Sequence, residues 1–380
     1  MFNRRLLTKA LGPLAIALMV PTTGVLPTAH TAAAASTPPT TVHIAIGPYL
    51  DYEPWVVAKD LGFDKEFGIN LQITEVPNSE TAYLDLRRGD IQVAYDCIAC
   101  AFSAIPHFPQ LREFMITNQF TGFQAIGRKG QALTFAGLTA SGLSQSQAKK
   151  RIVDSWKGKT FDIVSATFKA LVKGALASEG LPLTAVHIDT FSNDSEAALA
   201  FERGVGNFYT GSLPEEAELL LNRHGAYVDV GGDTVFGPGA LWYSTMSSTQ
   251  AWLTHNRSTV LDLMAVWYRT TQALATEPAK AVPILQRTIN QASGTTFSVT
   301  ELTNILQRHF LIYNTVSEAK QVTYNPTNPS DWVRQASFYA RENAPTLPHG
   351  YNFRVNYVCT SYFNMFLHDT TLVNRVTAAS

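Results

Sequence analysis

The chain has 380 residues, of which 46% are hydrophobic and 16% are charged, and its formal net charge at pH 7 is −1. A nearly neutral chain without a basic stripe gives no support to nucleic-acid binding. After position 35 the sequence shows no internal repeat and no low-complexity block, and its length is enough for two domains of ordinary size.

Residues 1–35 have the pattern of an export signal. Arg4 and Arg5 precede the apolar segment Leu14–Val20, and the small residues Ala32–Ala35 offer a cleavage site. The apolar segment is too short and too interrupted by proline to predict a transmembrane helix. We therefore expect a periplasmic protein, exported by an ordinary or a twin-arginine signal. The absence of a cysteine near the cleavage site argues against a lipid anchor.

Strands and helices alternate in the next part of the chain. Apolar residues at alternate positions predict strands, and apolar residues three and four apart predict helices. The expected order is strand Val42–Ile46, helix Trp55–Leu61, strand Leu71–Val76, helix Thr81–Arg88 and strand Ile91–Tyr95. This alternation implies right-handed crossovers and parallel pairing, and such sheets bind ligands at the carboxyl ends of their strands.

Short motifs in this opening unit, taken in their order and spacing, carry a resemblance to a known family. The motifs are Val57-Ala58-Lys59, Leu61-Gly62-Phe63, Lys65-Glu66-Phe67-Gly68 and Arg88-Gly89-Asp90-Ile91-Gln92-Val93-Ala94. They resemble the opening of the periplasmic substrate-binding proteins of nitrate, sulfonate (taurine) and thiamine-precursor ABC importers. The resemblance implies an α/β, two-lobe type II periplasmic-binding-protein fold, with two crossovers between the lobes and C-terminal helices packed on lobe one.

The resemblance also implies where the lobes divide. Residues 36–41 form a linker, residues 42–126 and 237–380 form lobe one, and residues 127–236 form lobe two. Residues 130–150 are small and polar, and we interpret them as an insertion whose structure the pattern does not define. Further strands are expected at Met115–Phe120, Phe123–Arg128, Thr160–Val164, Val186–Asp189 and Gly206–Gly211, the last being the final strand expected in lobe two.

The remainder of the chain is predicted to be helical. Apolar residues three and four apart predict helices at Ser258–Thr276, Pro278–Asn290, Ser298–Arg308 and Trp332–Glu342. The segment Asn356–Tyr362 resembles the family's terminal motif, although Cys359 and Thr360 stand in place of its paired acids.

Residues at the expected strand ends define a candidate ligand site. Lobe one, lobe two and the return crossover each contribute to it, and its members are Tyr49, Asp51, Tyr52, Trp55, Asn78, Ser79, Tyr95, Asp96, Cys97, Ser165, Thr167, Tyr209, Ser212 and Trp242. Aromatic rings bind planar or cationic groups, and carboxylates beside them accept hydrogen bonds. The helix start at Ser165 to Thr167 would suit an anionic group, or Ser165 only caps its own helix.

No arginine or lysine falls on a predicted loop of this site, which makes a strongly basic nitrate site the less favoured alternative. We expect an amine-bearing, heteroaromatic or sulfonate solute, and for each aromatic residue a core position remains the alternative.

The pair Cys97 and Cys100 is the one cysteine motif, and Cys359 is a third cysteine without a partner in sequence. In an exported protein, Cys-x-x-C can be a disulfide, a redox couple or half of a metal site. A local disulfide or two buried thiols is the favoured reading of this motif.

Catalytic motifs are absent: the sequence contains no Gly-x-Ser-x-Gly, no P-loop and no His-Glu-x-x-His. We expect a solute-binding protein rather than an enzyme, monomeric, with no catalytic residue, no cofactor and no metal, whose partner is the membrane permease of an ABC importer. The alternatives are an enzyme of the same fold acting on a thiamine-pyrimidine compound, and a ligand sensor for a membrane receptor.

Overall fold

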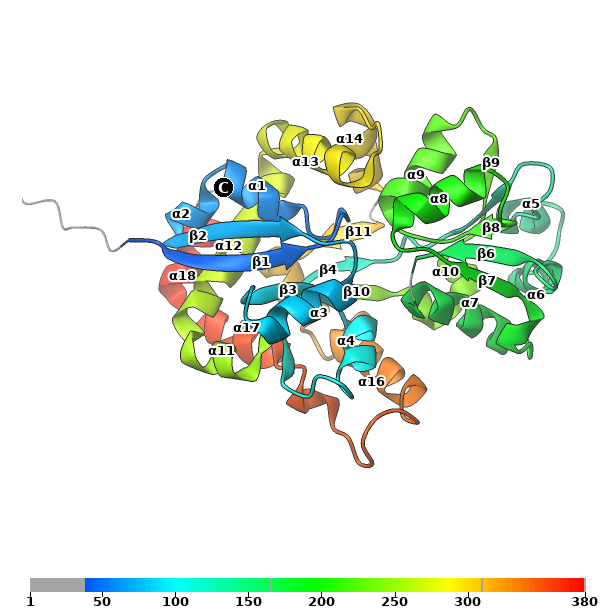
Figure 1. Cartoon of the computed structure of the whole chain (residues 1–380). Helices are drawn as coiled ribbons and strands as arrows, with labels where there is room; N and C mark the ends of the chain where they lie inside the picture. The colour runs from blue at the N-terminus through cyan, green and yellow to red at the C-terminus, as the bar shows by residue number, and fades with distance from the viewer. Residues whose placement is uncertain (1–37, 165, 309, 379–380) are drawn as a thin grey trace, which may run out of the picture. The chain divides into compact units, whose positions relative to one another are not determined.

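A computed structural model describes residues 38–164, 166–308 and 310–378 (Figure 1). Residues 39–380 form one compact unit, and the predicted export signal lies outside the described residues. The strands are β1 Thr40–Ile46, β2 Ile69–Glu75, β3 Val93–Cys97, β4 Leu111–Phe120, β5 Ala125–Arg128, β6 Thr160–Ile163, β7 His187–Thr190, β8 Phe208–Tyr209, β9 Tyr227–Gly231, β10 Trp242–Thr249 and β11 Leu311–Tyr313.

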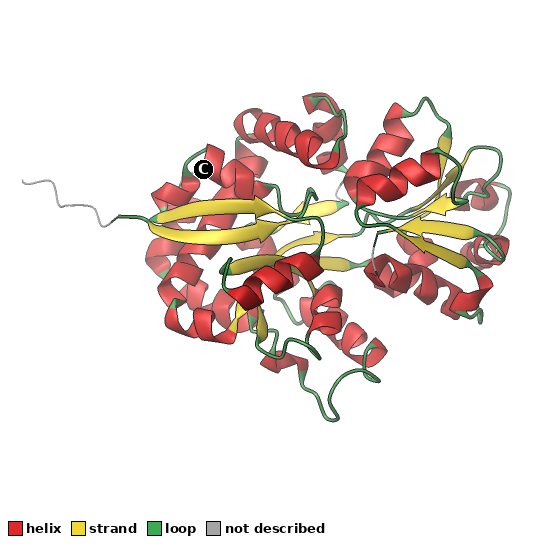
Figure 2. Ribbon diagram, viewed as in Figure 1, coloured by secondary structure: helices red, strands yellow, loops and turns green. Residues whose placement is uncertain are grey.

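Helices are the more abundant element (Figure 2). The α-helices are α1 Pro54–Asp60, α2 Phe63–Glu66, α3 Ser79–Arg88, α4 Ile98–Ala104, α5 Phe135–Ala140, α6 Gln145–Ser155, α7 Ala166–Ser178, α8 Asp194–Glu202, α9 Leu213–Asn222, α10 Asp233–Phe236, α11 Gln250–His255, α12 Arg257–Thr276, α13 Pro278–Ser293, α14 Val299–Gln307, α15 Val316–Glu318, α16 Trp332–Glu342, α17 Cys359–His368 and α18 Thr370–Thr377. Shorter helical turns are η1 Leu183–Ala185, η2 Gly237–Ala240, η3 Ala319–Thr323 and η4 Phe353–Val355.

Lobe one is built on a six-stranded sheet in the order β11-β4-β10-β3-β1-β2. Strand β1 pairs in parallel with β2 and β3, while β10 runs antiparallel to β3 and β4. The apolar residues of β1 are buried, which explains why alternation in the sequence predicted this strand. The expectation of a purely helical C-terminal part is wrong at β11, because Leu311–Tyr313 pairs with β4 at the edge of the sheet.

Lobe two is built on a five-stranded sheet in the order β7-β6-β8-β5-β9. Strand β6 pairs in parallel with β7 and β8, and β5 runs antiparallel to β8 and β9. The expectation that Gly206–Gly211 holds the final strand of this lobe is wrong, because β9 follows it and pairs with β5. The predicted insertion at 130–150 contains α5 and the start of α6, whose N-terminus is closed by a capping box between Ser144 and Gln147.

Two segments connect the sheets. The chain leaves lobe one from β4 through Thr121–Gln124 into β5, and it returns from η2 into β10. Helices of the C-terminal half pack on the lobe-one sheet and on its helices: α17 contacts β4, and α12 contacts α1 and α18. The two-lobe α/β architecture with two crossovers is therefore confirmed.

Helices α3 and α4 begin where β2 and β3 end, and both starts are capped by side chains. The Asn78 side chain accepts a hydrogen bond from the backbone N–H of Thr81 at 3.0 Å. The Cys97 sulfur accepts one from the backbone N–H of Cys100 at 2.8 Å. Helix α3 ends at Gly89, which adopts the left-handed conformation (φ 82°) that favours glycine. These caps fix the starts of both helices at the carboxyl ends of β2 and β3.

Over the described part of the chain, no helix combines the length and the apolar character needed to span a bilayer.

Candidate functional site

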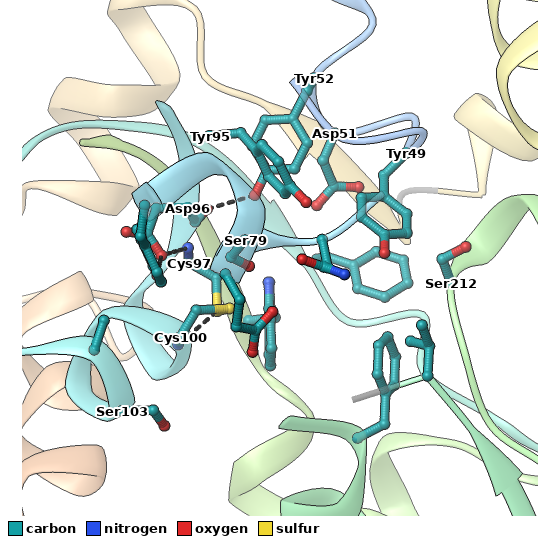
Figure 3. Close-up of a pocket in the computed structure, with 18 of the residues that line it drawn as sticks. Tyr49, Asp51, Tyr52, Ser79, Tyr95, Asp96, Cys97, Cys100, Ser103 and Ser212 are labelled. Atoms are coloured by element: carbon teal, nitrogen blue, oxygen red, sulfur yellow. Dashed lines mark hydrogen bonds between the residues drawn. A yellow bond between two sulfur atoms is a disulfide. The ribbon is translucent and has the colours of Figure 1, made fainter. Parts of the chain in front are cut away.

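A cavity of about 370 Å³ lies where the two lobes face each other (Figure 3). Lobe one lines most of it, and lobe two contributes Val164, Phe168, Ser212 and Leu213. This volume is typical of a site for a small organic molecule.

The structure brings most of the predicted site together. The predicted residues that line the cavity are Tyr49, Asp51, Tyr52, Asn78, Ser79, Tyr95, Asp96, Cys97, Ser212 and Trp242. Of the others, Ser165 lies outside the described residues, and the side chain of Thr167 is not among those described.

Trp55 and Tyr209 face away from the cavity, into the cores of their lobes. The Trp55 ring packs on Trp267 with ring centroids 5.1 Å apart. The Tyr209 hydroxyl donates to Asp194 at 2.7 Å, and its ring stacks on Phe201. Both side chains are almost fully buried, so Trp55 and Tyr209 occupy core positions rather than ligand-facing ones.

Asp51 holds its carboxylate at the cavity through two donors from lobe one. The Asn118 amide donates to Asp51 Oδ2 at 3.2 Å, and the Ser244 hydroxyl donates to the same oxygen. Burial raises the pKa of Asp51, and the hydrogen bonds from Ser244 and Asn118 offset that rise only in part. Both donors come from strands of the sheet, β10 and β4, so the position of the carboxylate is fixed by the fold.

Asp96, one residue before the end of β3, is another carboxyl group of the cavity. Its Oδ1 atom accepts hydrogen bonds from the Tyr83 hydroxyl at 2.6 Å and from the Cys97 N–H at 2.7 Å. Its backbone carbonyl accepts a hydrogen bond from the Tyr52 hydroxyl. Burial raises the pKa of Asp96 to about 6. The neighbouring Glu113 is also buried, and burial together with the charge of Asp96 raises its pKa well above the ordinary value.

Two buried acids, Asp194 and Glu215, lie behind Ser212 on the lobe-two side. The Ser212 N–H donates to Asp194 at 2.6 Å, and the Ser212 hydroxyl donates to Glu215 at 2.6 Å. Burial is the main cause of the raised pKa of both carboxyl groups. Ser212 thus has both of its donor groups engaged and presents mainly an acceptor to the cavity.

Aromatic rings form two parts of the wall. Tyr95 lies between Tyr52 and Tyr49, with centroid distances of 4.8 Å and 6.3 Å (Figure 3). Around the crossovers, Phe123 contacts the rings of Phe120, Phe168 and Trp242, at centroid distances of 4.6, 5.6 and 5.1 Å. The second cluster joins both lobes to the connecting segments, so it couples the cavity wall to any relative motion of the lobes.

Cys97 and Cys100 are joined by a disulfide that lines the cavity. Cys359 is a buried free thiol that donates to the backbone carbonyl of Glu113. Among the described residues, no group of three or more His, Cys, Asp or Glu side chains is arranged to hold a metal ion.

Sequence reasoning missed the part of the cavity that lies along helices. The cavity-lining residues that were not predicted are Glu80, Tyr83, Leu84, Arg87, Ser103, Ala104, His107, Phe108, Phe120, Phe123, Val164, Phe168 and Leu213. Most of them lie on the sides of α3 and α4, or just beyond α4, rather than at strand ends. Their spacing at three and four residues is visible in the sequence, but the same spacing is expected of any helix packed on a core.

No protein-family model matches the chain, and no curated protein matches it in sequence. Solved structures do match. The periplasmic aliphatic sulphonate binding protein SsuA from Escherichia coli shares 14% identity at a TM-score of 0.61, over 87% of this chain and 99% of that chain. The periplasmic nitrate-binding protein NrtA from Synechocystis PCC 6803 shares 12% identity at a TM-score of 0.56, over 90% of this chain and 89% of that chain.

A conserved gene product of Candida albicans, described as exhibiting the generic periplasmic binding protein structural fold, shares 10% identity at a TM-score of 0.55. It matches over 86% of this chain and 96% of that chain. These likenesses extend over most of the chain. The chain therefore has the two-lobe fold of the periplasmic binding proteins.

Proposed function

We propose that the chain is a periplasmic solute-binding protein that captures a small amine-bearing organic solute between its lobes and delivers it to the permease of an ABC importer. The observation that carries the proposal is the wall of the cavity, where Asp51 and Asp96 lie beside the rings of Tyr49, Tyr52 and Tyr95. Carboxylates beside aromatic rings suit a protonated amine or a cationic heteroaromatic ring, because the two kinds of group attract a cation by charge and by ring quadrupole.

The scarcity of cationic side chains around the cavity supports a cationic solute further. Among the described residues that line the cavity, Arg87 is the one arginine or lysine, and it lies at the far end of α3 from Asp51. An anion near Asp51 would therefore meet carboxylates without a neighbouring cationic side chain.

The similar solved structures are described as binding sulfonate or nitrate. In this chain a sulfonate is the second candidate, and the N-terminus of α7 next to the cavity-lining Phe168 would favour it. An amino-sulfonate would combine both interactions.

The proposal assigns no catalytic step to the cavity. The two alternatives from sequence, an enzyme acting on a pyrimidine and a sensor that docks to a receptor, use the same cavity. Turnover of the bound compound would identify the enzyme, and binding to a receptor in place of a permease would identify the sensor.

A thermal-shift screen of the purified protein tests the proposal. The panel contains n-butylamine, thiamine and its pyrimidine precursors, taurine, alkanesulfonates, nitrate and divalent metals. A ligand at 100 times its Kd adds about 2.7 kcal/mol to the unfolding free energy, so a true ligand raises Tm by several degrees. We expect the shift with an amine-bearing compound.

The variant Asp51→Asn identifies the site. Loss of a charge-assisted hydrogen bond should weaken binding of the amine about tenfold to a hundredfold in titration calorimetry. Asp90→Asn, at an exposed aspartate next to Gly89 and outside the cavity, is the matched control and should bind as the wild type does. A shift with nitrate or an alkanesulfonate alone, unaffected by Asp51→Asn, would contradict the cationic assignment.

A further inference from the structure

The cavity does not stop at the strand ends but continues between α3 and α4. Tyr83, Leu84 and Arg87 line it from α3, and they recur three and four residues apart on one face of that helix. Ser103, Ala104, His107 and Phe108 line it from α4 and the segment that follows. We call this part of the cavity the α3–α4 arm. From Glu80 to Arg87 it follows α3 for about 10 Å, at the usual helical rise per residue.

Arg87 closes the far end of the arm. Its guanidinium donates to the backbone carbonyl of His107, and it lies over the Phe108 ring at 4.9 Å from the centroid. The contact joins the end of α3 to the segment after α4. The arm is consequently bounded in length, while Leu84, which is 48% exposed, leaves it open along one side.

The middle of the arm is apolar. Leu84, Ala104 and the Phe108 ring present carbon atoms, and the Tyr83 hydroxyl is engaged with Asp96, which leaves its ring as the surface facing the cavity. The Cys97–Cys100 disulfide forms the wall where the arm joins the main cavity. The carboxylate of Asp51 lines the same cavity beside the tyrosine rings (Figure 3), whereas Arg87 lines it from the last turn of α3.

The cavity thus has a carboxylate in its main part and apolar surface in the α3–α4 arm, which suits a solute with one charged and one apolar part. We propose that the ligand is an amphiphilic amine, whose protonated amino group binds at Asp51 and whose apolar alkyl or aryl arm lies between α3 and α4. The inference rests on the proposed function and deepens it. The carboxylates select the amino group, and the α3–α4 arm selects the alkyl or aryl group attached to it. Arg87 limits the length of chain that the arm accepts.

Titration calorimetry with a series of n-alkylamines, from butylamine to octylamine, tests the inference on the purified protein. In the wild type each added methylene should raise the affinity by up to about fourfold, the effect of burying one methylene group. The gain should stop once the chain reaches Arg87. In Arg87→Ala, which opens the far end, the gain should continue to longer chains.

Ala104→Trp fills the middle of the arm and should abolish the dependence of affinity on chain length. Ala136→Trp introduces the same side chain at an exposed position of α5 in lobe two, and it should keep the wild-type dependence. Leu84→Asn is a second variant at a partly exposed position where folding is less at risk, and it should reduce the gain per methylene.

The outcomes separate the inference from the proposed function. If butylamine binds and Asp51→Asn weakens it, but affinity is the same for all chain lengths, the α3–α4 arm is not used and the proposed function stands. An unchanged gain per methylene in both Ala104→Trp and Leu84→Asn would also overturn the inference. If no amine of any length binds while a sulfonate or nitrate does, both the inference and the cationic assignment fail.

Discussion

Glu53 is buried in lobe one, next to the loop that carries Asp51, and its Oε1 atom has no hydrogen-bonding partner among the described residues. Burial raises the pKa of Glu53 from 4.5 to about 7, a rise that a hydrogen bond from Thr288 offsets only in part. The folded protein therefore retains this proton between pH 4.5 and 7, whereas the unfolded chain has released it. The unfolding free energy should fall as pH rises through this window.

Glu53→Gln should remove the part of the pH dependence of the unfolding free energy that Glu53 causes. At pH 8 the variant should be more stable than the wild type by on the order of 3 kcal/mol, and at pH 4 the two should be nearly equal. Chemical denaturation at both pH values measures the difference. The exposed Glu342→Gln serves as the control and should follow the wild type. A stability gain for Glu53→Gln of equal size at both pH values would show that the effect is not protonation.

At the scale of elements, the Cys97–Cys100 disulfide joins the end of β3 to the first turn of α4. The loop that it closes is very short, so on the chain-entropy account reduction should lower the unfolding free energy by only about 2 kcal/mol. Thermal melts with and without a phosphine reductant measure this loss. The double variant Cys97→Ser with Cys100→Ser should melt near the reduced wild type and should not respond to the reductant. A response of the double variant would show that the reductant acts on stability by a route other than this disulfide.

Elements also show what the sequence could predict. Strand β1 was predictable because the branched apolar residues Val42, Ile44 and Ile46 stand at alternate positions, and α3 because Asn78 and Gly89 mark its ends. Strand β11 was not predictable, because it has three residues and is a strand only through its pairing with β4. A segment so short carries no periodicity of its own.

The limits of sequence periodicity also explain which residues of the candidate site could be predicted. Rules about strand ends predicted Asp96, which lies in the end of β3, and Asp51 and Ser212, which lie in the loops that follow β1 and β8. The α3–α4 arm escaped prediction because helical spacing on α3 does not reveal whether a helix face meets a core or a cavity. For Trp55 the sequence could not decide between core and ligand, and only the contact with Trp267 shows a core position.

At the scale of the whole molecule, the fold gathers acids from distant parts of the chain around one cavity, which makes solute binding depend on pH. The pKa of Asp96 is raised to about 6 and that of Asp51 is raised, in both cases first by burial. A cationic solute favours the ionised carboxylates and so lowers these pKa values on binding. Affinity should be constant above the raised pKa values and should fall as the pH drops through them, which for Asp96 means below about pH 6, by up to tenfold per pH unit for each group.

Titration calorimetry of butylamine between pH 8 and pH 5 measures this dependence. A neutral compound of the same length, n-butanol, is the control, and any weak binding that it shows should not weaken as the pH falls. Butylamine binding that is unchanged or tighter at lower pH would show that these carboxylates do not hold the amino group, and it would contradict the cationic assignment.

The aromatic cluster at the crossovers has a practical consequence. Trp242 lines the cavity and touches Phe123, whereas Trp55, Trp156, Trp267 and Trp332 are buried within the lobe cores. The sixth tryptophan, Trp252 on α11, is partly buried and does not line the cavity. An indole in this position is sensitive both to the arrival of a solute and to the rearrangement of the crossover rings. The intrinsic fluorescence of the protein thus offers an unlabelled optical signal of cavity filling, with Trp242→Phe as the variant that would silence it.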